Sequence, residues 1–171
     1  MEDPLDDHLS TVSPRTMQKP RLLLNHIREA YPIGIPALSV KSTTDRIGLD
    51  AGYSFHLGTP EPELRRIASW ILTNINDVEI IESIIGRLWK RFGREDLVLS
   101  SILLANLPDD NKMENWKWIT LIELVSRVEK KKMRIPVEVI LLHVEEMVRA
   151  NCAEIEENLA LKMLNGTKAE N

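Results

Sequence analysis

The sequence predicts an all-α protein in which helical hairpins stack side by side as an α-solenoid. Three observations support this fold class. Apolar residues recur at helical spacing from residue 61 onward, the periodic stretches end at glycine or proline, and successive hairpins begin 34 and 41 residues apart. A compact bundle of six or seven helices would use the same helices, because periodicity reports buried faces and not their arrangement. Both architectures remain open at this level.

The N-terminal third of the chain has the weakest pattern. Residues 1–19 are polar with two prolines and no periodicity, which predicts a mobile tail. Residues 20–31 carry apolar side chains at helical spacing and predict a short helix. Residues 32–60 contain three prolines and four glycines and fit no single period, so we expect irregular helix or a functional segment there. One domain is expected over residues 20–166, with a short C-terminal tail over 167–171.

Three helices are predicted in the middle of the chain. Thr59 is suited to cap a helix over residues 61–75, whose apolar residues form one continuous stripe. Asp77 is suited to cap a second helix that ends at Gly93. The stretch over residues 96–107 is apolar on nearly all sides, and therefore predicts a buried central helix.

The C-terminal part of the chain is helical and acidic. A helix is expected near residues 114–132, and Pro136 opens another. The periodic residues 154–165 either continue that helix or follow a break before them. Residues 135–171 contain 7 acidic and 3 basic side chains, so the negative charge of the protein gathers in this part.

Composition excludes several classes of protein. With 43% hydrophobic and 28% charged residues the chain is typical of a globular protein, and its net charge of −4 argues against indiscriminate binding to nucleic acid. No apolar run approaches the roughly 20 residues that cross a bilayer, and the N-terminus lacks the regions of a signal peptide. We therefore expect a cytoplasmic protein without membrane contact. The single cysteine and the spacing of the four histidines predict neither a metal site nor a cofactor.

Basic residues are the first candidates for a functional surface. Familiar catalytic motifs do not occur, so no catalytic residue is expected. Four cations between residues 87 and 94 stand at i, i+3, i+4 and i+7, and would share one side of a helix that continued to residue 94. The candidates for contact with DNA phosphates are Arg65, Arg66, Arg87, Lys90, Arg91 and Arg94. The alternative is a solvated helix face balanced by Glu79, Glu82, Glu95 and Asp96.

Trp116 and Trp118 stand two positions apart in a chain with 5% aromatic residues. On a helix they lie about 200° apart, so they cannot both face one core stripe. Trp116 follows a polar turn, which makes it the candidate for a half-exposed ring that contacts a ligand or a base. The alternative is a ring that lies over the end of a neighbouring hairpin.

Three stretches within residues 53–125 carry a family resemblance: YSFHLGTPEPELRRIASWI, GRLWKRFGREDLVLSSILLANL and ENWKWIT. They resemble the HEAT-like-repeat DNA alkylation repair family of alkylpurine DNA glycosylases. The matching residues are Leu57, Gly58, Pro62, Leu64, Arg65, Ile67, Ala68, Leu88, Trp89, Glu95, Asn115 and Trp116. The resemblance implies a solenoid of HEAT-like hairpins whose concave, basic surface binds duplex DNA. It also implies excision of cationic alkylated purines, with aromatic rings and an aspartate stabilising the positive charge.

The chain departs from the family pattern at Thr120, which stands where the resemblance places that aspartate. A neutral hydroxyl cannot replace the charge of a carboxylate. We therefore expect an alkylation-repair-like helical-repeat protein that binds duplex DNA and whose glycosylase activity is doubtful. The alternative is a non-catalytic scaffold that binds another protein through its acidic C-terminal helices or its N-terminal tail.

Overall fold

The computed structural model describes residues 3–35, 52–109, 112–129 and 135–152, together with residues 154, 155, 158, 160 and 161. Within this part of the chain the protein forms eight α-helices and no strand, which confirms the predicted all-α class. The helices are α1 (Pro4–Ser10), α2 (Pro14–Met17), α3 (Pro20–Ile33), α4 (Glu61–Asn74), α5 (Val78–Arg91), α6 (Arg94–Asn106), α7 (Trp116–Glu129) and α8 (Val137–Arg149). None of these helices is long and apolar enough to cross a bilayer. The expected helix over 154–165 and the expected C-terminal tail fall mostly or wholly outside the described residues.

Residues 4–10 and 14–17 are helical, in contrast to the mobile tail expected from the polar composition of this segment. The side chain of Asp3 caps α1 by accepting a hydrogen bond from the N–H of Leu5 at 2.9 Å. Leu5 and Leu9, four residues apart, lie on one side of α1 and are buried. Helix α1 packs against α3 through this side, so the N-terminal segment is part of the core.

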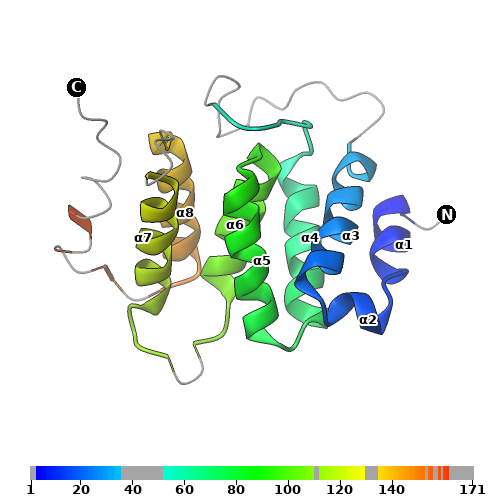
Figure 1. The fold of residues 1–171 in the computed structure, drawn as a ribbon, viewed down its shortest axis with the longest axis horizontal. Helices are drawn as coiled ribbons and strands as arrows, with labels where there is room; N and C mark the ends of the chain where they lie inside the picture. The colour runs from blue at the N-terminus through cyan, green and yellow to red at the C-terminus, as the bar shows by residue number, and fades with distance from the viewer. Residues whose placement is uncertain are drawn as a thin grey trace.

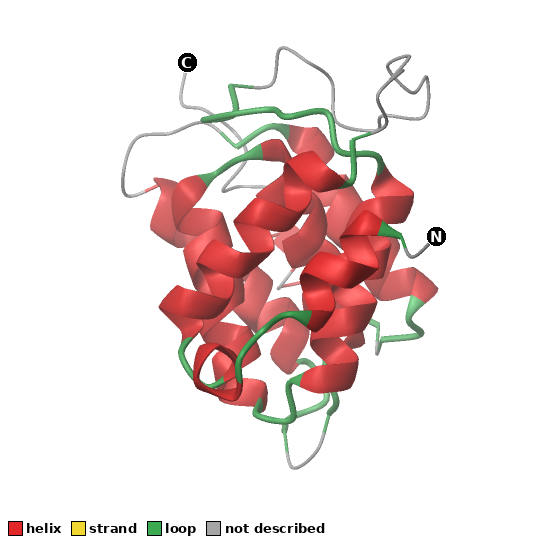
Figure 2. Ribbon diagram, turned by 90° about the vertical axis from the view of Figure 1, so that its right-hand side faces the viewer, coloured by secondary structure: helices red, strands yellow, loops and turns green. Residues whose placement is uncertain are grey.

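The longer helices form two rows. Helix α6 lies between α4 and α8 in one row, and α5 lies between α3 and α7 in the other. Contacts between α3 and α4 and between α5 and α6 join the rows. Figure 1 shows the helices side by side along the longest axis, from α1 near the N-terminus to α7 and α8. Figure 2 views the same helices from the α1 end.

Helix α6 is the central element, as its apolar sequence predicts. Every residue from Arg94 to Ala105 is buried. Ser100 of α6 is hydrogen-bonded to buried polar side chains of the neighbouring helices. Trp89 Nε1 donates to Ser100 Oγ at 2.9 Å, and His143 Nε2 lies 3.4 Å from the same oxygen. These contacts join α5, α6 and α8 around one buried hydroxyl group.

Candidate functional site

The predicted row of cations is interrupted after Arg91. Helix α5 ends there because Phe92 adopts a left-handed backbone conformation, with φ of 58°. Arg94 begins α6 instead, and it is buried. Arg87 and Lys90 are exposed on α5. The structure therefore does not bring the four cations to one side of a single helix.

Arg91 and Arg94 make contacts inside the protein. Arg91 Nε lies 3.4 Å from Asp96 Oδ2, and its guanidinium lies 4.9 Å from the centroid of the Phe55 ring. Burial lowers the pKa of Arg91. Arg94 Nη1 donates a hydrogen bond to the carbonyl oxygen of Thr59 at 2.9 Å. Both guanidinium groups thus stabilise the fold where α5 meets α6.

The two arginines of α4 are also paired with acids. Arg65 Nη2 lies 2.7 Å from Glu61 Oε1 and 2.5 Å from Glu146 Oε1, so it joins α4 to α8. Arg66 is ion-paired with three carboxylates, those of Asp3, Asp6 and Glu63. Hydrogen bonds to these acids raise the pKa of both arginines. Four of the six predicted phosphate-binding cations are therefore engaged by groups of the protein itself.

Glu95 and Asp96 are fully buried, although a solvated helix face was one expectation for them. They occupy the first turn of α6, where the helix dipole favours negative charge. Glu95 Oε1 accepts hydrogen bonds from the backbone N–H groups of Leu57, Gly58 and Thr59 at 3.0, 2.8 and 3.3 Å. This carboxylate holds residues 57–59 against the start of α6. The sequence feature that indicates this contact is an acid pair directly before the apolar residues of α6.

The preceding residues are bound to the same turn. The N–H of Ser54 donates to the carbonyl oxygen of Phe92 at 3.0 Å, and the N–H of Arg94 donates to that of Phe55 at 3.0 Å. The Phe55 ring packs so closely on Gly93 that a β-carbon at this position would overlap the ring. We name this arrangement of residues 54–59 on residues 92–96 the α6 corner.

Asp96 of the α6 corner forms a buried polar pair with Tyr31 of α3. The Tyr31 hydroxyl donates to Asp96 Oδ1 at 3.0 Å. Burial raises the pKa of Asp96 to about 6 and also raises the pKa of Tyr31. Such a carboxyl exchanges a proton near neutral pH, as many general acids do. Because both side chains are 0% exposed, however, a substrate has no access to them, and we assign them a structural role.

A groove between α5 and α7 contains the tryptophan that the sequence singles out. Its volume is about 370 Å³. Lys112 Nζ lies 4.0 Å from the centroid of the Trp116 ring and is ion-paired with Glu82. The Thr120 hydroxyl donates to the carbonyl oxygen of Trp116 at 2.9 Å. In the groove, the ammonium group of Lys112 therefore covers one face of the Trp116 indole. The Thr120 hydroxyl, at the position where the resemblance places a carboxylate, is bound to the backbone.

Trp116 is more buried than the half-exposed ring that we expected. It is the first residue of α7, and only 8% of it is exposed. Its Nε1 donates to Asp109 Oδ1 at 2.7 Å across the preceding turn. Trp118 is 3% exposed and belongs to the core. Both rings are thus structural anchors, and Trp116 in addition lines the groove.

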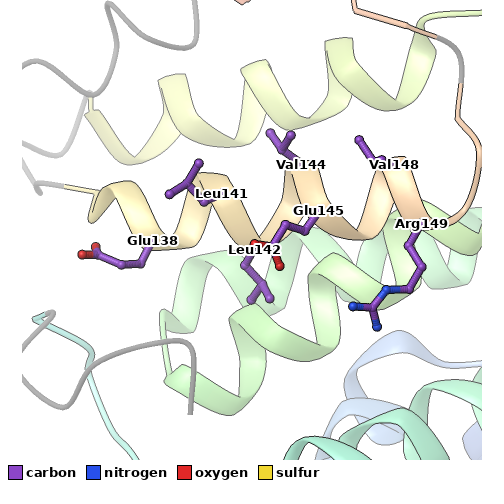
Figure 3. Close-up of a pocket in the computed structure, with 7 residues that line it drawn as sticks. All are labelled: Glu138, Leu141, Leu142, Val144, Glu145, Val148 and Arg149. Atoms are coloured by element: carbon purple, nitrogen blue, oxygen red, sulfur yellow. The ribbon is translucent and has the colours of Figure 1, made fainter. Parts of the chain in front are cut away.

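An apolar stripe lies exposed on α8. Val137, Leu141 and Val148 are 53%, 54% and 66% exposed, and Val144 between them is partly buried. Figure 3 shows Leu141, Val144 and Val148 along one side of the helix, opposite Leu142 and Arg149. A cavity of about 840 Å³ lies over this part of α8, and Glu138, Glu145 and Arg149 are among its lining residues. We name Val137, Leu141, Val144 and Val148 the α8 stripe.

Comparison with known proteins gives no family for this chain. None of the family models, curated proteins or solved structures with which it was compared matches it.

Proposed function

We propose that the protein is a non-catalytic helical scaffold that binds a basic, amphipathic helix of a partner protein along the α8 stripe. The observation that carries this proposal is the exposure of three large aliphatic side chains in a row, at 53%, 54% and 66%. Leaving such side chains in water forfeits roughly 1 kcal/mol or more each, which burial under a partner recovers.

Spacing favours a helix as the partner. The members of the α8 stripe follow each other at intervals of four, three and four residues, the repeat with which two α-helices pack along a shared seam. Charge favours a basic helix. Glu138 and Glu145 line the cavity over the stripe, and the sequence from residue 135 onward contains 7 acidic and 3 basic residues.

The arrangement of helices supports a repeat scaffold. We infer that the hairpins stack as a solenoid, since α4, α6 and α8 follow one another in one row and α3, α5 and α7 in the other. In such an arrangement each hairpin contacts its neighbours and the last helices present an unpaired face. Helix α8 occupies that terminal place among the described helices.

A peptide-binding experiment tests the scaffold proposal. The probe is a labelled helical peptide of about 15 residues with leucine at i, i+4, i+7 and i+11 and lysine on its flanks. We expect Leu141→Ser and Val148→Ser each to weaken its binding by about tenfold, because a half-buried aliphatic contact contributes roughly 1.4 kcal/mol. Fluorescence anisotropy with the full chain measures the change. Met113→Ser removes a 73% exposed apolar side chain elsewhere, and should leave binding unchanged.

Three results would contradict this assignment. The first is equal binding of a peptide with the same leucines and glutamate flanks. The second is a concentration-dependent dimer that Leu141→Ser dissociates, which would give the α8 stripe to a second copy of the chain. The third is binding that appears only after residues 153–171 are removed, which would give the stripe to the chain's own C-terminal residues.

A second candidate, supported by the family resemblance, is binding of duplex DNA through α5 and the α5–α7 groove. Arg87 and Lys90 are exposed on α5, and Gly86 next to them lines the groove. The Trp116 ring already carries a cation on its face, the contact that a cationic base would make. We give this candidate second place because Arg65, Arg66, Arg91 and Arg94 are engaged within the fold.

Salt dependence tests the DNA candidate. With two cations on phosphates, the logarithm of the affinity for duplex DNA should fall with the logarithm of salt concentration at a slope of about −2. Arg87→Ala combined with Lys90→Ala should remove most of this slope. Lys19→Ala combined with Arg21→Ala changes the charge equally on exposed residues of another region, and should leave the slope as it is. No binding at low salt would reject the candidate.

A further inference from the structure

The contact between α1 and α3 brings a histidine of α1 next to a histidine and a glutamate of α3. His8 lies on α1, whereas His26 and Glu29 lie on α3. One ligand atom from each of the three side chains lies within 4.8 Å of the other two. We propose that His8, His26 and Glu29 form a binding site for a divalent transition-metal ion, with zinc as the expected ion.

His8 is held in the way that metal-binding histidines commonly are. Its Nε2 lies 3.0 Å from the carbonyl oxygen of His26. A carbonyl oxygen only accepts hydrogen bonds, so Nε2 carries the proton and the lone pair of the neutral ring is on Nδ1. In metal sites the second ring nitrogen usually donates to a carbonyl or carboxylate, which fixes the ring orientation and tautomer. This supporting hydrogen bond is already in place for His8.

His26 has a ring nitrogen that the fold leaves unused. Its ring stacks on that of His8, with centroids 4.2 Å apart and planes inclined by 14°. Nε2 of His26 is buried and has no hydrogen-bond partner among the described residues. Burial and the neighbouring His8 lower the pKa of His26, so the ring is neutral at pH 7, the form that binds metal. A bound metal ion would give this nitrogen a partner.

Glu29 completes the donor set. It follows His26 by three residues, so both side chains lie on the same side of α3. Two imidazoles and one carboxylate are a zinc-binding set that leaves a fourth position for water, and imidazole also suits copper and nickel. Histidine spacing predicted no metal site, because the third ligand, His8, comes from a different helix.

Metal binding would also join α1 to α3. Ligands from two helices meet at one ion only when the helices are packed together, so the ion favours the folded arrangement over the unfolded chain. Zinc should therefore raise the thermal stability of the protein. The expected rise in Tm is roughly 5–11 °C when zinc is present at about a hundredfold excess over its dissociation constant.

Calorimetric titration of the full chain with zinc chloride at about pH 7.5 tests the proposal. We expect one zinc ion per chain, and at least roughly tenfold weaker binding for His26→Gln and for Glu29→Gln. Glu29 is exposed, so its variant keeps the fold even if loss of a histidine loosens α1. His56→Gln removes a histidine outside the site and should bind zinc like the parent protein. Absence of zinc binding, or equal binding by all the variants, would overturn the proposal.

Discussion

Replacing Glu95 with alanine should lower the free energy of unfolding by about 4 kcal/mol. The carboxylate accepts three backbone hydrogen bonds, from Leu57, Gly58 and Thr59, at 2.8 to 3.3 Å. Alanine would leave these N–H groups without their acceptor. Because Glu95 is fully buried, water could not easily replace the lost carboxylate. It would also leave Arg94, 3.6 Å from Glu95, without its neighbouring charge. Chemical denaturation measures the loss.

Hydrogen exchange distinguishes this cause from a general loss of packing. In Glu95→Ala the amides of Leu57, Gly58 and Thr59 should lose protection before those of α6 do, because their acceptor is gone while the helix remains. Glu95→Gln keeps an accepting oxygen of similar position, so it should cost less than the alanine variant. If both variants destabilise equally and the three amides keep their protection, the carboxylate does not hold the α6 corner.

The helices could be predicted because their signals are local. Every helix expected from periodicity between residues 20 and 149 is present, and Asp77 caps α5 as predicted by accepting a hydrogen bond from the N–H of Glu79. Helix α1 was not predicted. Its seven residues contain only two buried leucines, too few to show a period, and its stability comes from packing on α3.

The candidate sites were harder to predict because they depend on contacts across the fold. Basic residues at helical spacing indicate a shared surface only if the helix continues, and the left-handed Phe92 stops α5 before Arg94. The spacing also does not show that Arg65 meets Glu146, 81 residues away. For the same reason His8 and His26 gave no signal in the sequence. The sequence shows that the residues of the α8 stripe are apolar. Only the packing of the helices shows which of them remain exposed to solvent.

Asp96 provides a prediction about pH. Its carboxyl is 0% exposed, and burial raises its pKa from 3.8 to about 6. Because the folded-state pKa lies above the unfolded value, the contribution of this group to stability is fully present below pH 3.8 and is lost as the pH rises through 6. The difference of about two pKa units corresponds to about 3 kcal/mol. In the native protein at neutral pH, the ionised Asp96 therefore costs stability.

Asp96→Asn should remove this pH-dependent cost. Asparagine resembles the protonated acid in shape and still accepts the hydrogen bond from Tyr31, so the variant and the parent should have similar stability below about pH 4. Near pH 7 the variant should be more stable by about 3 kcal/mol, a rise in Tm of roughly 6–12 °C, since its side chain does not ionise. Thermal unfolding of both proteins across this pH range measures the difference.

Asp77→Asn changes an exposed acid at a helix cap and should show no comparable gain. The stability of Asp96→Asn relative to the parent protein should therefore change with pH. If this difference stays constant, the buried carboxyl of Asp96 does not titrate with a raised pKa.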